Sequence, residues 1–454
     1  MAEVMEFELS QEYLERFERA IEERDSRFIS QSLESVKPAD ITALLQEFGT
    51  EECKYVFDIL PPEIDAYVLI ELEDDPRAEF MTNFSSRELA DFLDCLDSDD
   101  GADILLQLPP HRQEEVIGMV SSDEKAGHLL DLIRYDEDVA GGLMAKELIK
   151  ANKNWSVTQT IEEIRKQAEN VQKIFSIYVV DNQDRLIGKV SLKRIILASD
   201  KLKIADLYDD NVISVDTLMS DREVATVMQK YDLEAVPVVN ARGKLVGRIT
   251  VDDIIDVITE IAEEERQLMT GISSDVDEDD TVWALSKARL PWLIIGMVGG
   301  LMAAQITDLF SGDMALVAGL ALFIPLIMAT GGNVGIQSSS IVVQSLANKS
   351  AFEGSLINRL IKVLFVAVVN GIILAIMVFG SIILIFRDQP LALTVSIALF
   401  SVVLLASFMG TITPLVLDKY GINPALASGP FITTANDLLG LAVYFSIAHL
   451  LYTG

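Results

Sequence analysis

The apolar residues of this chain are spaced in different ways along its length. Over residues 1–145, Leu, Ile, Phe and Val recur at helical spacing and strand-like alternation is absent. Over 146–253, short apolar runs bounded by turn residues alternate with helical segments, as in α/β units. A helical acidic segment and linker follow at 254–280, and from 281 to 454 long uncharged stretches dominate. We therefore predict a multidomain membrane protein with an all-α N domain, an α/β middle, a connecting helix and an all-α transmembrane domain.

The last third of the chain predicts five membrane-spanning helices. A span needs roughly 20 apolar residues. The uncharged stretches are 290–307, 314–348, 363–386, 389–417 and 420–454, the last of them interrupted by one acid.

The charges between these stretches predict their orientation. Lys287 and Arg289 precede the first span, and Lys349, Arg359 and Lys362 lie between the second and the third. Positive residues mark the cytoplasmic side of a membrane. We therefore expect a multi-pass protein whose N-terminal domains are cytoplasmic and whose C-terminus lies outside.

The second span contains a segment that predicts an interruption of the helix. Gly331, Gly332 and Asn333 follow one another there. Glycines loosen a helix and free backbone carbonyls, which is tolerated at membrane depth beside a wet cavity. We expect these three residues to line an ion path. The alternative is a close helix–helix packing site, for which small residues are also used.

The fifth span carries the strongest chemical signal, because Asp437 lies near its middle. A buried charge there is costly unless it meets water, a partner or an ion. The spans contain no basic residue deep enough to pair with it, so we expect a cation as its partner. Thr433, Thr434 and Asn436 add oxygens on neighbouring turns and are predicted to line the path. The alternative is a protonated structural carboxyl.

One acid per chain is a weak site for a divalent ion, but a two-fold symmetric dimer would supply two. Mg²⁺ is reluctant to lose its water shell and fits a wide ring of oxygens, whereas Ca²⁺ prefers more direct carboxylates. This reasoning favours Mg²⁺ without excluding Mn²⁺, Co²⁺ or Ni²⁺.

The first 145 residues contain an internal repeat with an offset of 48. The segment 40–45 (DITALL) matches 88–93 (ELADFL), and 59–62 (ILPP) matches 107–110 (QLPP). This period is typical of stacked helical hairpins, so we predict a short superhelical solenoid.

A second repeat with an offset of 59 has the pattern strand, turn, strand, helix. The segment 177–191 returns at 236–250. Two such units resemble a CBS-domain pair, a module that often binds adenosine nucleotides. The Thr/Ser-x-x-Asp pattern that would hold ribose is present at Thr250 and Asp253, but Arg194 stands at the equivalent position of the first unit. ATP or another adenosine nucleotide is therefore expected at the second unit only.

The charge of the chain is concentrated before the membrane spans. Of its 70 acidic and 36 basic residues, residues 1–289 carry a net charge of −33. Such a surface repels phosphate, so we expect no nucleic-acid partner. Two cysteines and three scattered histidines form no zinc pattern or nucleophile–base pair, and we predict no enzyme activity. The N-terminus has no cleavable signal pattern.

Acidic residues gather in two places that would repel each other. One is the turn that contains Asp100 and Asp103. The other is the helix that follows the α/β pair, whose acids share one side: Asp252, Asp253, Asp256, Glu260, Glu263 and Glu264. Divalent cations bridging the two domains would close the assembly, whereas the acidic residues of the linker 274–280 are expected to be solvated.

The order of these parts resembles the MgtE magnesium channels over almost the whole chain. The matching strings are YDEDVAGGLM at 135–144, Gly331–Asn333 and SGPFITT at 428–434 with Asp437. The resemblance implies a homodimer in the bacterial plasma membrane with a Mg²⁺-selective pore, in which Asp437 holds hydrated Mg²⁺. It also implies that the helix after the CBS pair, about 254–270, is a plug. Asp100, Asp103 and Asp252 are then the matching sensor candidates.

One departure from that family and one rival remain. Asn423 precedes Pro424 where the family carries Asp, which puts one gate site in doubt. The alternative function is a secondary divalent-cation transporter driven by Na⁺ or H⁺, since broken helices and a midspan acid suit that class too.

Overall fold

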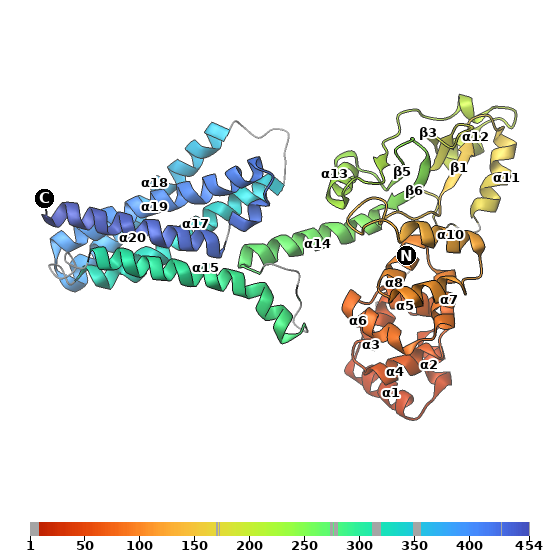
Figure 1. Cartoon of the computed structure of the whole chain (residues 1–454), viewed down its shortest axis with the longest axis horizontal. Helices are drawn as coiled ribbons and strands as arrows, with labels where there is room; N and C mark the ends of the chain where they lie inside the picture. The colour runs from red at the N-terminus through yellow and green to blue at the C-terminus, as the bar shows by residue number, and fades with distance from the viewer. Residues whose placement is uncertain are drawn as a thin grey trace. The chain divides into compact units, whose positions relative to one another are not determined.

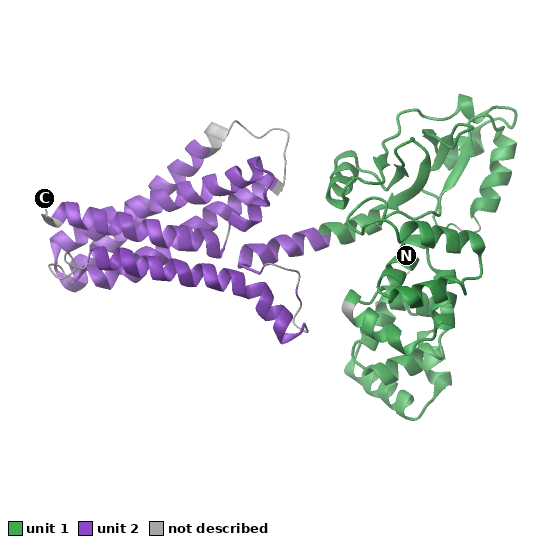
Figure 2. Ribbon diagram, in the orientation of Figure 1, with its two compact units in different colours: residues 1–258 green, residues 259–454 purple. Residues whose placement is uncertain are grey.

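The computed structural model of the chain describes residues 9–168, 171, 173–272, 276, 280–310, 319–347, 356–427 and 429–453. Lys349, Ser428 and most of the acidic linker, about which predictions were made, lie outside this set, as does the side chain of Arg359. The chain forms two compact units, 1–258 and 259–454 (Figure 2).

The first part of unit 1 is helical (Figure 1). Its elements are α1(Gln11–Glu22), α2(Ser26–Leu33), α3(Pro38–Leu45), α4(Thr50–Phe57), α5(Pro62–Ile70), α6(Asp74–Phe80), η1(Met81–Asn83), α7(Ser86–Cys95), α8(Ser98–Leu106), α9(Pro110–Ile117) and α10(Asp123–Leu132). Prolines at the first position of α3, α5 and α9 fit there because that position needs no N–H. The core includes Phe57, Phe84 and Phe92, whose rings meet edge to face.

The predicted repeat of 48 residues is confirmed. The helices α3, α4 and α5 begin at residues 38, 50 and 62, and α7, α8 and α9 begin at 86, 98 and 110. The helix α5 packs against both α3 and α7, and α7 packs against α9. Successive hairpins therefore stack as a solenoid does.

The second part of unit 1 consists of two similar α/β units. Their elements are β1(Ile149–Asn152), α11(Val157–Gln167), β2(Ile177–Val180), β3(Leu186–Val190), α12(Leu192–Leu197) and η3(Ile204–Asp206), then β4(Val215–Asp216), α13(Asp221–Tyr231), β5(Ala235–Val239) and β6(Leu245–Thr250). Each sheet has a parallel pair followed by an antiparallel pair, in the order β1-β2-β3 and β4-β5-β6. The duplication predicted from the offset of 59 is confirmed.

A continuous helix, α14(Val251–Thr270), begins directly after β6. Ile254 and Val257 are its buried residues. The helix starts in unit 1 and ends in unit 2.

Unit 2 contains α15(Val282–Leu309), η4(Leu320–Phe323), α17(Ile324–Ala347), α18(Leu356–Phe386), α19(Gln389–Lys419), η5(Pro424–Ala427) and α20(Pro430–Thr453). Among the described residues, five helices are long and apolar enough to cross a membrane, as predicted. The helix α19 packs against α17, α18 and α20, and α15 packs against α20. The helix α19 is the most buried of the five, whereas α15 and α18 leave most of their apolar side chains uncovered, as helices facing lipid do.

The predicted interruption at Gly331–Asn333 is wrong. The helix α17 runs through all three residues. A Cβ on Gly331 would lie 3.0 Å from Cγ1 of Val402 on α19, and one on Gly332 would lie 3.2 Å from Cγ2 of Thr433 on α20. These glycines therefore let helices approach closely instead of freeing carbonyls.

Candidate metal sites

The midspan acid lies on the face of α20 that meets α17. A Cβ on Gly332 would lie 4.0 Å from Oδ1 of Asp437, and Thr433 precedes Asp437 by one helical turn on the same face. The carboxyl is only half-buried within the chain. The neighbouring Asn333 is exposed. Asp437 and Thr433 thus lie together where α20 meets Gly332 of α17, whereas the role of Asn333 in lining the path stays a prediction.

Two other residues predicted to line the path lie elsewhere. Asn436 is 2% exposed, and its Nδ2 atom occupies the space that a Cβ on Gly335 would need, 1.8 Å away. The methyl group of Thr434 lies against Gly299 of α15. Asn436 is thus packed against α17 within the chain, and its role in lining the path stays a prediction. Gly331 and Gly332 offer no free backbone, since they belong to a continuous helix.

The oxygens of Asp437 and Thr433 suit a cation that keeps its water. Among the described residues, no three His, Cys, Asp or Glu side chains are grouped to hold a metal ion directly. A single carboxylate with a neighbouring hydroxyl oxygen can bind the water shell of Mg²⁺, which that ion gives up reluctantly.

The end of α14 lies against the beginning of α20. Gly271 and Gly429 both have a positive φ, of 87° and 55°. A Cβ on Gly429 would lie 2.2 Å from the carbonyl oxygen of Met269, and one on Gly271 would lie 2.5 Å from Cγ of Pro430. These two glycines bring the connecting helix into contact with the helix that carries Asp437, about two turns before it.

The second acidic group lies where α8 meets the start of α14, within unit 1. Asp99 and Asp100 occupy the first turn of α8, with Asp103 on the next, and Asp252 and Asp253 occupy the first turn of α14. Burial of the carboxyl is the main cause that raises the pKa of Asp100 to about 7, followed by the negative charges of Asp253 and Asp97. Desolvation by the surrounding protein, followed by the charge of Asp100, raises the pKa of Asp103 to about 7, although this residue is exposed. The charges of Asp253 and Asp252 thus act on Asp100, and a cation bridging the two acidic groups stays a prediction.

Burial also raises the pKa of Asp99, Asp253 and Asp256. A carboxyl in such a group gives up its proton more readily when a cation is near. Glu260, Glu263 and Glu264 lie farther along α14, and Glu260 is about 12 Å beyond Asp252 by helical rise, in unit 2. Their role as metal ligands stays a prediction.

Thr250 and Asp253, which match the predicted ribose-binding pattern, are hydrogen-bonded to each other. Thr250 donates to Oδ2 of Asp253 from its N–H at 2.9 Å and from its hydroxyl at 2.8 Å. In the first unit, Ser191 accepts from the N–H of Arg194 instead. Asn423, the departure in the loop before α20, accepts from the N–H of Ala425 at 2.9 Å and so caps η5.

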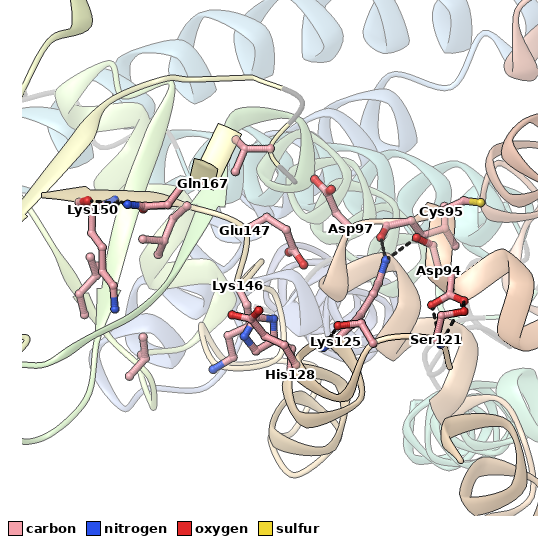
Figure 3. Close-up of a pocket in the computed structure, with 17 residues that line it drawn as sticks. Asp94, Cys95, Asp97, Ser121, Lys125, His128, Lys146, Glu147, Lys150 and Gln167 are labelled. Atoms are coloured by element: carbon pink, nitrogen blue, oxygen red, sulfur yellow. Dashed lines mark hydrogen bonds between the residues drawn. The ribbon is translucent and has the colours of Figure 1, made fainter. Parts of the chain in front are cut away.

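A cavity of about 790 Å³ opens beside the acidic junction, between α7, α10 and the first sheet (Figure 3). Lys125 donates to the carbonyl oxygens of Asp94 and Leu96, and Ser121 donates to the Asp94 carboxylate. Lys146, also in its wall, pairs with Asp131 at 2.6 Å. These charged groups are already bonded within the chain, so we assign the cavity no ligand.

Two basic residues near the acids were not foreseen from the sequence. Arg77 and Arg248 are 6% and 5% exposed, and Arg77 lowers the pKa of Asp100 while Arg248 lowers that of Asp253. No local pattern marks them, because each comes from a segment far in sequence from the acids of α8.

Comparison with known proteins gives matches along most of the chain. The MgtE family model, described as a divalent cation transporter, matches residues 324–447, and the MgtE intracellular N domain matches 36–138. The CBS domain matches 138–201 and 204–260. The magnesium transporter MgtE of Thermus thermophilus is 32% identical over 96% of this chain and 97% of its own. That of Bacillus subtilis is 28% identical over 90% and 96%.

Two solved structures resemble part of the chain. The cytosolic domain of the Mg²⁺ channel MgtE in complex with ATP covers 54% of this chain and 99% of its own, with 32% identity and a TM-score of 0.51. The soluble part of a magnesium transporter covers 56% and 99%, with 26% identity and a TM-score of 0.50.

Proposed function

Because the chain belongs to the MgtE family of divalent cation transporters, we propose that it is a Mg²⁺-selective channel that is closed by Mg²⁺ itself. The observation that carries this proposal is Asp437, a half-buried carboxyl near the middle of α20, one turn after Thr433 and beside Gly332 of α17. A charge at this depth is favourable where it meets an ion or water.

The ion path is proposed to form between two copies of the chain. One chain supplies one midspan carboxylate, and a two-fold axis beside the α17–α20 edge would bring two together. Two carboxylates with surrounding oxygens would bind Mg²⁺ through its water shell. In this arrangement the acidic N domain and CBS pair face the cytoplasm of a bacterial cell and the C-terminus lies outside.

The gate is proposed to be α14. Its end contacts the start of α20 at Gly429 and Pro430, and its beginning carries Asp252 and Asp253 opposite the acids of α8. Mg²⁺ between the two acidic groups would hold the N domain on the CBS pair. Because α14 is continuous, its position couples that site to the membrane helices, as a ligand-driven shift between two states requires.

A channel is distinguished from the rival function, a transporter coupled to Na⁺ or H⁺, by the gradient that drives Mg²⁺ uptake. Purified protein in liposomes should take up Mg²⁺ under an inside-negative potential alone, with no Na⁺ or pH gradient. Uptake that starts only when one of those gradients is imposed would refute the channel and support the transporter. Empty liposomes with the same potential serve as the control.

The sensor is tested by neutralising acids of α8. The pair Asp100→Asn and Asp103→Asn should leave conduction intact but require about tenfold more Mg²⁺ for closure, a typical size for coupling between sites. The matched control is Glu15→Gln with Glu18→Gln, an equal charge change on exposed positions of α1. Unchanged Mg²⁺ sensitivity in the α8 variant would remove these residues from the gate.

The nucleotide site is proposed to lie in the second CBS unit. A relative's cytosolic domain is described in complex with ATP, and this chain retains Thr250 and Asp253 while Arg194 replaces the acid in the first unit. Loss of ATP binding in Asp253→Asn, with binding unchanged in Arg194→Ala, is the expected result in equilibrium dialysis.

A further inference from the structure

A buried arginine of the CBS pair reaches across the junction to the N domain, where Lys146 also pairs with Asp131 at 2.6 Å. Arg248 lies on β6, and its Nη2 atom is 3.7 Å from Oδ2 of Asp97, the residue that precedes α8. Its Nη1 atom donates to the carbonyl oxygen of Lys173 at 3.3 Å, and its guanidinium lies 5.3 Å from the ring centre of Phe175. The side chain is thus anchored in the CBS pair and directed at the N domain.

Further bonds join the same two domains without any metal. The N–H and hydroxyl of Ser98 donate to Oε2 of Glu147 at 3.1 and 2.7 Å. The N–H of Lys146 donates to the hydroxyl of Ser98 at 2.8 Å. Figure 3 shows Lys146, Glu147 and Asp97 at the edge of the cavity beside this junction. The amides of Ser98 and Lys146 therefore report directly on whether the domains are docked.

Whether Arg77 or Arg248 favours docking depends on the domain to which each arginine belongs. Arg77 is held inside the N domain by Gln107, Asp74 and the carbonyl of Ile70. It offsets the acids of α8 equally whether the domains are docked or apart. Arg248 meets Asp97 only when the domains are docked, so its attraction to the acids of α8 contributes to docking itself.

We propose that Arg248 is a built-in counterion that lowers the Mg²⁺ concentration at which the N domain docks on the CBS pair. The inference rests on the proposed Mg²⁺ sensor at the same junction. Arg248 and Mg²⁺ both offset the repulsion between the acids of α8 and α14, so each makes the other less necessary. Arg248 thereby sets how much docking remains at low Mg²⁺.

The test is hydrogen–deuterium exchange by mass spectrometry on the full-length protein in detergent, with EDTA and with saturating Mg²⁺. In EDTA, peptides containing the amides of Ser98 and Lys146 should exchange about tenfold faster in Arg248→Gln than in wild type. At saturating Mg²⁺, the exchange rates of Arg248→Gln and wild type should become similar. Arg248→Lys, which keeps the charge, should stay near wild type. Arg185→Gln, which removes an exposed arginine paired with Asp181 in the same domain, is the control and should change neither peptide.

The alternatives give different patterns. Equal acceleration in EDTA and in Mg²⁺ would show that Arg248 only packs the interface and would overturn the proposal. Wild-type exchange in Arg248→Gln under EDTA would overturn it too, while a Mg²⁺ response in the same samples would leave the sensor standing. If Mg²⁺ changes exchange in no variant, the sensor and the counterion proposal both fail.

Discussion

At the scale of single residues, glycines determine where the membrane helices meet. Gly335 on α17 lies between Gly410 on α19 and Asn436 on α20: a Cβ on Gly410 would lie 2.4 Å from the Gly335 carbonyl oxygen, and one on Gly335 would lie 1.8 Å from Nδ2 of Asn436. The two polar atoms of the Asn436 side chain are buried and have no hydrogen-bond partner among the residues that the structure describes. Packing at this crossing therefore leaves little space for change.

Adding one methyl group at this crossing should destabilise the protein. Gly335→Ala is expected to cost about 1–3 kcal/mol of unfolding free energy through overpacking. Thermal unfolding in detergent measures it. Gly380→Ala on α18, where a Cβ would meet nothing within 4 Å, is the control and should be neutral or slightly stabilising. The double variant Gly335→Ala with Asn436→Ala should recover part of the loss. Equal melting temperatures for Gly335→Ala and wild type would contradict this packing.

At the scale of elements, repeats made most of unit 1 predictable. An offset of 48 in the sequence became three helices that begin 48 residues after their counterparts, and the offset of 59 became two sheets of the same topology. The course of α17 was mispredicted, because glycine content alone cannot separate a broken helix from a tightly packed one. The close contacts of Gly331 with α19 and of Gly335 with α20 show that α17 is tightly packed. These contacts join segments that are far apart in sequence.

The acids of α8 should make the stability of the folded chain depend on pH. The pKa values of Asp100 and Asp103 are about 7, against an ordinary 3.8, so the folded state binds more protons than the unfolded state between these limits. Stability therefore falls as pH rises from about 4 to 7, and the loss is complete above the raised value.

Thermal unfolding of the full chain in EDTA should accordingly give a lower melting temperature at pH 8 than at pH 6. The increase produced by Mg²⁺ should be larger at pH 8, where the carboxyls are ionised. Burial also raises the pKa of Asp65, in α5, to about 8, so the α8 contribution is isolated with the Asp100→Asn, Asp103→Asn pair, which should flatten the dependence. A melting temperature that rises with pH in EDTA would be incompatible with raised pKa values for these two carboxyls.

At the scale of the whole molecule, the sequence predicted the order of the parts but not how they contact one another. Charge placement was enough to find five spans and an acidic half, and Asp437 stood out because no basic residue lies near it in the spans. The contact of α14 with Gly429 and Pro430 was not predicted, nor was the position of Arg248 beside Asp97. Both depend on long-range packing, which leaves no periodic or compositional signal in a single sequence.

The most direct test of the account is Mg²⁺ uptake into liposomes under an inside-negative potential by Asp437→Asn, a nearly isosteric change that removes the charge. Wild type should conduct, and the rate of Mg²⁺ uptake should be at least about tenfold lower in Asp437→Asn, because the midspan charge is the proposed binding group. Asp308→Asn, at an exposed acid near the end of α15, should conduct like wild type. Full uptake by Asp437→Asn would mean that the carboxyl is structural and that the ion path lies elsewhere.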